Sequence, residues 1–471
     1  MDADILIRGG EVVAADAVFR ADVAIAGEKI VAVGDGLTGK TVIDATGRYV
    51  MPGAIDSHVH FRTPGYDYKE DWQTGTGAAA RGGVTTVLEM PNTLPPTGTL
   101  EALRQKQAIA ARQAYVDYGI YGLLDENNLE QLEALSEAGV SGFKCFMGNT
   151  FGDLPAPSDG AMLEGFEILA RLGKRCTVHA ENASIMARRQ AKLEAAGRTD
   201  TLAHLAARPE VCAIEAVSRA VIFAEWTGAR LHIAHKSSAD ALYVLRDARR
   251  RGVDVTVETC PQYLLLSTED QKRIGNVMRV NPPIREPGHQ EALWQALREG
   301  VVDMIATDHA PHTPEEKTRA SVWRCDCGFP GVETQMPLML TEVNGGRLSI
   351  CDYVRYACVN PAKAWGFTGK GTIRPGADAD IVLVDIRREW SIDQSQLFSK
   401  SKISPWHGRR VQGGPVTTMV RGRVVMQDGR MVAEPGWGKP ARQQMPAPAP
   451  RNRAKTTAAI TAQGASVRKT G

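Results

Sequence analysis

Short apolar strands alternate with amphipathic helical segments through the middle of the chain, and this alternation constrains the fold more than any other feature. Helical runs such as TLEALRQKQAIAARQAYV and VCAIEAVSRAVIFAEW separate the strands. The eight candidate strands are residues 54–60, 84–90, 118–124, 141–147, 176–180, 230–235, 254–260 and 303–308. Eight strand–helix units predict an α/β fold, a (β/α)8 barrel of the TIM type. A doubly wound open sheet is the alternative, but it usually carries a Gly-rich phosphate turn after its first strand, and the sequence has none there.

Both ends of the chain have a different pattern, in which short apolar–polar alternations are broken by Gly and Asp. This pattern is typical of antiparallel strands. We therefore expect a small β-sandwich assembled from residues 1–52 and 371–436, with the barrel at 53–370. Residues 437–471 are rich in Pro, Ala and Arg and contain no acidic residue, so we expect a disordered basic tail there.

Charge is unevenly distributed over the 471 residues. The total is +2, from 56 basic and 54 acidic residues, but seven basic residues lie in the tail. The rest therefore holds 49 basic against 54 acidic residues, which gives no case for a nucleic-acid or membrane partner. No apolar run reaches the roughly 18 residues of a transmembrane helix. Because the acidic N-terminus is unlike a signal peptide and the eight cysteines are scattered, we expect a cytoplasmic protein.

Metal-ligand side chains gather at the carboxyl ends of the candidate strands. In DSHVH, strand alternation places His58 and His60 on one face of the first strand. The fourth strand carries a lysine within the apolar run GFKCFM, and three later strands end in His179, His235 and Asp308. Catalytic groups of a (β/α)8 barrel lie at this end of the strands. We therefore predict a metal site formed by His58, His60, Lys144, His179, His235 and Asp308.

The chemistry of these side chains suits two divalent ions, with zinc as the expected metal. Imidazole and carboxylate are good zinc ligands. A lysine amine rarely ligates a metal, but Lys144 can react with carbon dioxide to give a carbamate, whose two oxygens can bridge two ions. Two ions about 4 Å apart can hold a hydroxide and polarise a carbonyl. Asp308 can then move a proton to a leaving nitrogen.

The motifs around these residues resemble those of the cyclic amidohydrolases, a family that includes dihydroorotases, allantoinases, hydantoinases and dihydropyrimidinases. The resemblance runs from about residue 3 to about residue 435 and rests on MPGAIDSHVH, GFKCFMG, VHAEN, LHIAHKSS, ETCPQYL, VNPPIR, TDHAPH and SPWHGR. It implies a barrel with a two-ended β-sandwich, hydrolysis of a cyclic amide or ureide, and a homodimer or homotetramer. By resemblance, His58, His60 and Asp308 hold one metal, His179 and His235 hold the second, and carbamylated Lys144 bridges them.

Two sets of motifs point to different small-molecule rings. HFRTPGYDY and MPNT look most like dihydroorotase, in which the residues matching Arg62 and Asn92 bind the ring carboxylate. VNPPIR and DHAPHTPEEK add Asn281 and His312 as substrate contacts. By contrast, GFKCFMG, LHIAHKSS and SPWHGRRV look more like allantoinase or hydantoinase, and Gln262 departs from the histidine common in ETCPHYL.

Substrate choice depends on the side chains that touch the ring, so we expect dihydroorotase, which interconverts L-dihydroorotate and N-carbamoyl-L-aspartate in pyrimidine biosynthesis. An allantoinase, or a hydantoinase or dihydropyrimidinase, acting on a neutral cyclic ureide is the alternative. A non-catalytic scaffold homologue is an alternative of another class. Among the histidines outside the ligand set, we expect His232 to point to the other face of its strand as a packed core residue, and His204 to lie at the surface or cap a helix.

Overall fold

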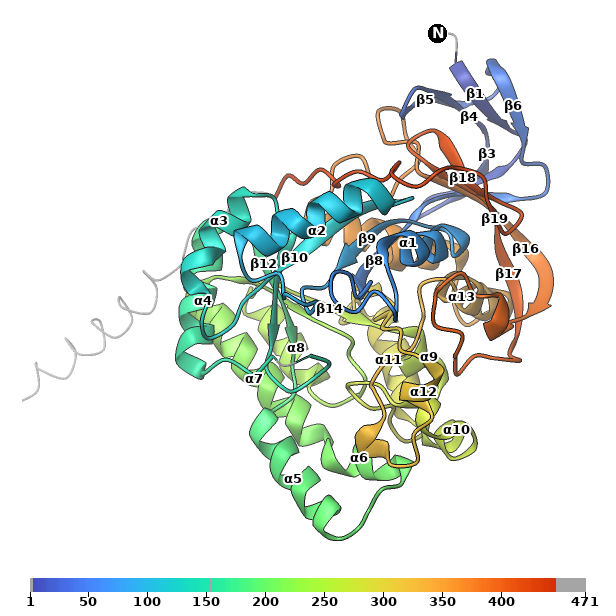
Figure 1. Ribbon diagram of the computed structural model, residues 1–471. Helices are drawn as coiled ribbons and strands as arrows, with labels where there is room; N and C mark the ends of the chain where they lie inside the picture. Colours follow the sequence, from blue (N-terminus) through green and yellow to red (C-terminus); the bar gives the residue numbers. More distant parts are fainter. Residues whose placement is uncertain (1–2, 153, 446–471) are drawn as a thin grey trace, which may run out of the picture.

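A parallel barrel forms the centre of the molecule. The computed structural model describes residues 3–152 and 154–445. Eight parallel strands pair in the order β8-β9-β10-β11-β12-β13-β14-β15 (Figure 1). They are β8 Ala54–Val59, β9 Val84–Glu89, β10 Asp117–Leu123, β11 Gly142–Phe146, β12 Arg175–His179, β13 Arg230–Ile233, β14 Val255–Thr259 and β15 Met304–Ile305. Each strand overlaps the range predicted for it, and the predicted barrel is confirmed.

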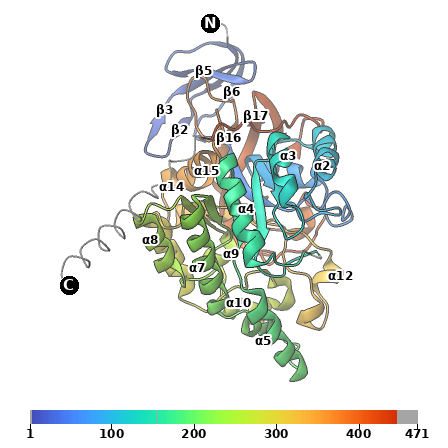
Figure 2. The same ribbon diagram turned by 90° about the vertical axis from the view of Figure 1, so that its left-hand side faces the viewer.

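Helices wrap the outside of the barrel, with α4, α7 and α8 covering one side of it in Figure 2. Local sequence determines where they begin and end. Asp71 caps α1 by accepting from the Thr74 amide, and Gly173 ends α4 at a φ of 66°, which glycine adopts without strain. The helices are α1 Trp72–Arg81, α2 Leu100–Gln113, α3 Leu132–Glu137, α4 Asp159–Leu172, α5 Ala183–Ala195, α6 Thr201–Ala207, α7 Glu210–Thr227, α8 Leu242–Arg250, α9 Pro261–Leu265, α10 Thr268–Ile274, α11 His289–Arg298, α12 Pro314–Lys317, α13 Gln335–Asn344, α14 Ile350–Val354 and α15 Asn360–Trp365.

The eighth strand is shorter than the sequence predicts. The pattern favours a strand over 303–308, but only Met304–Ile305 pairs with β14. The following residues close the barrel, because Val59 of β8 forms a bridge with His309 and the His60 amide donates to the His309 carbonyl at 2.7 Å. The end of the predicted strand therefore lies at the seam between the first and last strands.

Both ends of the chain build the β-sandwich, as predicted. One sheet has the order β19-β18-β17-β16-β7-β2-β3 and the other has the order β5-β4-β1-β6. The two ends of the chain meet where β7 pairs antiparallel with β16. The core between the sheets includes Ile7, Val23, Ile25, Val50, Ile381, Leu383 and Met419. The strands are β1 Ala3–Arg8, β2 Glu11–Val13, β3 Val18–Arg20, β4 Asp22–Ala26, β5 Lys29–Gly34, β6 Gly39–Asp44, β7 Tyr49–Pro52, β16 Ile381–Ser391, β17 Arg410–Val420, β18 Arg423–Gln427 and β19 Arg430–Met431.

The segment after the sandwich differs from the expectation of disorder from residue 437 onward. Residues 437–445 run from the sandwich along the barrel (red in Figure 1). The Trp437 indole donates to the Val420 carbonyl at 2.8 Å, and Tyr118 of β10 exchanges two backbone hydrogen bonds with the segment. Pairing with a strand edge orders a stretch that has no periodicity of its own. The rest of the predicted tail, 446–471, lies outside the described residues.

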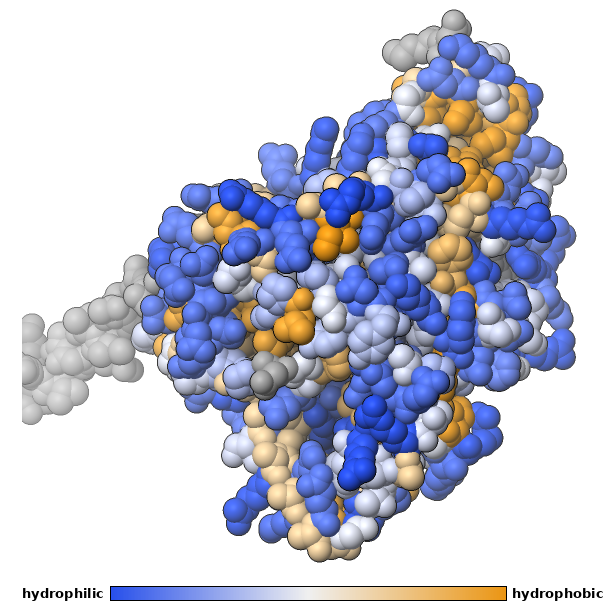
Figure 3. Space-filling view, viewed as in Figure 1, coloured by the Kyte–Doolittle hydropathy of each residue, from blue (hydrophilic) through white to orange (hydrophobic). Residues whose placement is uncertain are grey.

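The face seen in Figure 3 is largely hydrophilic, and apolar residues gather on it over the β-sandwich. Among the described residues, every helix is too short or too polar to span a membrane.

Candidate metal centre

Three predicted ligands meet at the carboxyl end of the barrel. His58 and His60 come from the end of β8, and Asp308 follows β15 across the seam. Asp308 Oδ1 lies 3.1 Å from His60 Nε2 and 3.3 Å from His58 Nε2. All three side chains are buried. Two imidazole nitrogens and a carboxylate oxygen at this spacing form a ligand set for one divalent ion.

Two further histidines form a pair beside this group. His179 ends β12 and His235 follows β13, with His179 Nδ1 3.0 Å from His235 Nε2. The rings of His58 and His235 lie 5.2 Å apart, so the pair and the first group are adjacent. Burial lowers the pKa of His58 to about 4 and also lowers the pKa of His179. The rings are therefore neutral, as metal ligands must be.

Lys144 of β11 brings its amine to the same place. Nζ is buried and has no hydrogen-bond partner within residues 3–152 and 154–445. The Lys144 charge lies close enough to His58 and His235 to lower the pKa of each, after burial and, for His235, after the charge of His179. Burial also lowers the pKa of Lys144, which favours the neutral amine. An orphaned buried amine is costly, so these residues fit a group that would complete Lys144 and the two histidine sets together.

Glu258 of β14 connects the two sets, and the sequence analysis missed it. This buried carboxylate accepts from His58 Nδ1 at 2.5 Å and from the His235 amide at 3.2 Å. The Ser57 hydroxyl donates to it at 2.6 Å. With Nδ1 of His58 bonded to Glu258, Nε2 remains available to a metal. A signal was present in the sequence, because Glu258 is an acid inside the apolar strand DVTVETC.

Glu181 holds His179 of the second pair in the same way, and it was not among the predicted site residues. Its Oε2 lies 2.9 Å from His179 Nε2 and is ion-paired with Arg208. Although burial raises it, the Arg208 charge and the His179 hydrogen bond lower the pKa of Glu181 to about 2. The Nε2 atom of His179 therefore faces the Glu181 carboxylate, and its Nδ1 atom faces His235. The signal was the position of Glu181 in VHAEN, two residues beyond the histidine.

The backbone is strained at three residues of the site. Arg62, His235 and Asp308 have φ values of 64°, 36° and 52°. Residues with a side chain rarely adopt positive φ, and such strain persists only where the surrounding structure enforces it. The strain at these positions is consistent with side chains held in place for chemistry.

His232 is a packed core residue, as expected, but it does not point away from the site. It is buried, but its Nε2 lies 3.1 Å from the Glu258 carboxylate that also holds His58. Strand alternation does not extend from His232 to His235, because β13 ends at Ile233 and the chain turns at His235.

The predicted substrate contacts are all buried, and each already has protein partners. They are Arg62, Asn92, Asn281 and His312. Arg62 Nε donates to the Pro311 carbonyl at 3.2 Å, and Nη2 lies 3.1 Å from His312 Nε2. The other ring nitrogen of His312 lies 3.0 Å from the Lys69 amine. Arg62 and His312 are thus neighbours, as expected of residues that share a site, but they bond to each other.

The two asparagines also differ from free substrate donors. His60 Nδ1 lies 2.7 Å from Asn92 Oδ1, so Asn92 orients a predicted metal ligand. Asn281 Oδ1 lies 2.8 Å from His204 Nε2. His204 is buried in this contact, which rules out the surface position that was one of its two expected roles. These pairs join segments far apart in sequence, which motif spacing alone does not connect.

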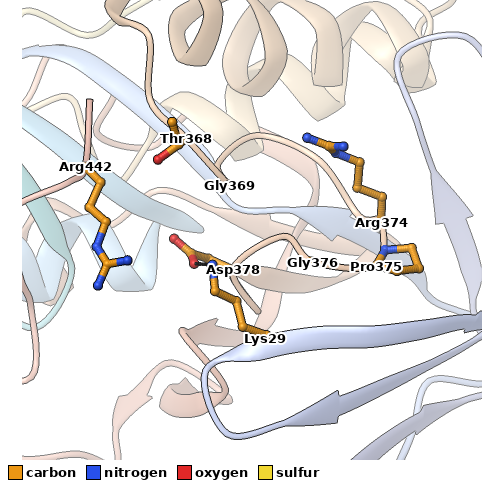
Figure 4. Close-up of a pocket in the computed structure, with 8 residues that line it drawn as sticks. All are labelled: Lys29, Thr368, Gly369, Arg374, Pro375, Gly376, Asp378 and Arg442. Atoms are coloured by element: carbon orange, nitrogen blue, oxygen red, sulfur yellow. Dashed lines mark hydrogen bonds and ion pairs between the residues drawn. The ribbon is translucent and has the colours of Figure 1, made fainter. Parts of the chain in front are cut away.

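A separate pocket lies where the sandwich meets the barrel (Figure 4). Its cavity measures about 250 Å³ and is lined by Lys29, Arg374 and Arg442 together with Asp378. Lys29 forms a 2.5 Å ion pair with Asp378 across it. None of the predicted ligands lines this pocket, so the candidate site remains the cluster at the carboxyl end of the barrel.

Comparison with known proteins decides the family. Residues 49–425 match the amidohydrolase family. The chain belongs to this family. It is 37% identical to an L-hydantoinase of Paenarthrobacter aurescens over 93% of this chain and 97% of that protein. It is 40% identical to an allantoinase of Rubrobacter xylanophilus over 92% and 96%.

A solved structure of the L-hydantoinase (dihydropyrimidinase) from Arthrobacter aurescens superposes with a TM-score of 0.91, at 37% identity, covering 93% of this chain and all of that one. This amidohydrolase is a hydrolase that acts on cyclic amides, which confirms the predicted reaction class. The names of these relatives favour the allantoinase and hydantoinase alternative over dihydroorotase.

Proposed function

We propose that this amidohydrolase opens a neutral cyclic ureide of the hydantoin or allantoin class. Water adds to a ring carbonyl, the ring C–N bond breaks, and the nitrogen takes up a proton to give an open-chain ureido acid. Relatives that cover more than nine-tenths of the chain and carry the names L-hydantoinase and allantoinase support this class of substrate.

The observation that carries the proposal is the engagement of Arg62. A carboxylated ring such as dihydroorotate needs a free cationic fork. Two of the three guanidinium nitrogens of Arg62 already face Pro311 and His312. The Asn92 side chain, the other predicted carboxylate contact, is bonded to His60 and to the Phe151 carbonyl. A neutral ring has no carboxylate, so its binding does not require Arg62 or Asn92 to be free.

Two divalent ions, which we propose to be zinc, would supply water activation and carbonyl polarisation when bound. His58, His60 and Asp308 would hold one ion, and His179 and His235 the other, with Lys144 as a bridging carbamate. The Asp308 carboxylate takes the proton from the attacking water and returns it to the leaving ring nitrogen. Glu258 and Glu181 keep the imidazoles oriented throughout.

Hydrolysis of four rings by the zinc-loaded protein tests the substrate class. Hydantoin, allantoin, dihydrouracil and dihydroorotate are compared through loss of the ring amide absorbance in the ultraviolet. We expect kcat/KM for at least one neutral ring to exceed that for dihydroorotate by about tenfold or more, the value of one charge-assisted hydrogen bond. A preference for dihydroorotate would contradict the proposal and favour pyrimidine metabolism instead.

Replacement of Lys144 tests the carbamate. Lys144→Ala should lose the bridge and with it about 100-fold or more in kcat, because one part of a coupled catalytic unit is removed. Added acetate or propionate should restore part of the activity by placing a carboxylate in the space left. As a control, Lys106→Ala removes a buried lysine that is paired with Glu89 at 2.6 Å, and acids should not rescue any loss there. Full activity of Lys144→Ala without an added acid would refute the carbamate.

A further inference from the structure

The ring of Phe151 packs against two cations beside the candidate metal centre. Arg62 Cζ and Lys69 Nζ each lie 4.3 Å from its centroid. The His312 ring meets it edge-on, with centroids 5.0 Å apart. Cations at this distance are attracted to the face of an aromatic ring. The Phe151 ring therefore occupies the space next to Arg62 that another group would otherwise fill.

Arg62 differs from Lys69 in how its charge is balanced. Lys69 forms ion pairs with Glu316 at 2.9 Å and Asp326 at 2.8 Å. Arg62 is 1% exposed, and no described carboxylate forms an ion pair with it. Its Nη1 also has no hydrogen-bond partner among the described residues. Asp308 and Asp326 act on the Arg62 charge only from beyond ion-pair distance. A buried guanidinium that no anion contacts still attracts one, and the ring face offsets this charge only in part.

The loop that carries Phe151 is anchored on both sides. Asn92 Nδ2 donates to the Phe151 carbonyl at 3.3 Å, and Arg208 Nη2 donates to the Asn149 carbonyl at 2.8 Å. At the start of the loop, a Cβ on Gly148 would lie 2.6 Å from the Glu181 carbonyl, so only glycine permits this approach. The groups that orient His60 and His179 thus also position the Phe151 ring.

We propose that Phe151 determines which rings the site accepts by covering Arg62. Its ring takes the place that a substrate carboxylate would need, so neutral rings enter and carboxylated rings are disfavoured. Removing the ring uncovers a cation that no described carboxylate contacts. This inference rests on the proposed function, because it names the residue that gives that site its preference for neutral rings.

A double-mutant cycle on the zinc-loaded full chain tests the inference. Phe151→Ala, Arg62→Met and the double variant are assayed on hydantoin and dihydroorotate, and the ratio of their kcat/KM values is compared. Phe151→Ala should raise the ratio of dihydroorotate to hydantoin by about tenfold or more. The double variant should show no rise, because the uncovered charge is gone. Phe398→Ala is the matched control, since Phe398 also faces an arginine, Arg81, at 5.9 Å but lies outside the site.

Two results would overturn the proposal: an unchanged ratio in Phe151→Ala, or an equal rise with and without Arg62. If alanine at this position prevents folding, Phe151→Leu removes the aromatic face while keeping apolar volume, and the same comparison applies. Calorimetry gives the Kd of dihydroorotate for the same three variants and the wild type. The double-mutant cycle can then be evaluated from affinity instead of turnover. A wild-type protein inactive on every neutral ring would contradict the proposed function, whereas the Kd cycle alone decides the role of Phe151.

Discussion

At the scale of single residues, Glu258 bonds to both histidine sets although it is not a predicted ligand. A buried carboxylate is costly unless donors surround it. Glu258 has such donors in the Ser57 hydroxyl, the His58 ring and the His235 amide. It therefore holds an imidazole from one ligand set and the backbone of the other, and its removal disturbs both.

We predict that Glu258→Gln weakens zinc binding by about 10- to 100-fold, the range for groups that orient metal ligands. The amide keeps the shape of the side chain but cannot accept from both His58 and Ser57 through charged oxygens. Competition with a zinc chelator measures the affinity. Glu333→Gln is the control, because Glu333 is a partly buried carboxylate that bonds to the Phe398 amide and pairs with Arg81 away from the centre. Equal zinc affinity of Glu258→Gln and wild type would rule out this role.

The sequence predicts the ligands better than their supports. Histidines and an aspartate at strand ends can be found from alternation alone, because barrel geometry brings those ends together. Glu181 and Glu258 were visible as acids in or after apolar strands, but only the structure shows what they bind. The partners of Asn92 and His312 come from loops whose paths no local pattern determines.

At the scale of elements, residues 437–445 act as a strap on the barrel. The Lys439 amide donates to the Asp117 carboxylate at 2.9 Å, and the Gln443 side chain donates to the Ser141 and Trp365 carbonyls at 3.0 Å. Ala441 packs against an apolar cluster that includes Leu88, Met90, Tyr121 and Trp365. These contacts cover one end of the barrel strands.

We predict that ending the chain after residue 436 lowers the Tm by about 4 °C or more relative to ending it after residue 445. Removing the strap exposes part of the cluster and leaves the Asp117 carboxylate without one donor, a loss of a few kcal/mol. Thermal unfolding followed by circular dichroism measures the difference. The chain ending at 445 is the control, since it retains every contact described for the strap. Identical Tm values would show that the strap adds no stability.

Element types follow from sequence more reliably than element ends. All eight barrel strands are predicted, because apolar runs of strand length recur between helices. The early end of β15 and the regular pairing of residues 437–445 are not predicted. Both depend on contacts with β8 and β10, which are distant in sequence.

At the scale of the whole molecule, one buried lysine joins the barrel to the sandwich. Lys370 Nζ lies 2.5 Å from Asp117 of β10 and 2.6 Å from Asp380, which precedes β16. Arg421, between β17 and β18, lies 3.0 Å from the same Asp117. Although burial lowers it, the carboxylates of Asp380 and Asp117 raise the pKa of Lys370 well above its ordinary value. The junction is charged but balanced.

We predict that Lys370→Met lowers the free energy of unfolding at pH 7 by about 3–5 kcal/mol, because it leaves buried carboxylates unpaired. Burial already raises the pKa of Asp380 to about 6, and loss of the ammonium raises it further. The folded variant then binds more protons than the unfolded chain, so its stability increases as pH falls. Urea unfolding should therefore show a smaller loss at pH 5 than at pH 7. The exposed Lys363→Met is the control, and an equal loss at both pH values would contradict the account.

The overall plan of the molecule is predictable because two periodicities separate its parts: barrel strands alternate with helices, while the ends alternate apolar and polar residues. The junction is not predictable, since Lys370 and its carboxylates lie in three segments that no motif connects. The same holds for substrate preference, where the match of Arg62 to dihydroorotase gave no sign of the aromatic ring that covers it.

The pairing of β7 with β16 also has a consequence for biosynthesis. More than 300 residues separate Pro52 from Ile381. At roughly 5–20 residues per second, a ribosome needs about 15 to 65 seconds to bridge that interval. Throughout this time the N-terminal strands have no partner from the other end, and their edges are open to other chains. The whole barrel is therefore synthesised before β7, β2 and β3 can join β16 in their sheet. A nascent-chain chaperone or slow expression should reduce aggregation through these strand edges most before residue 381 emerges.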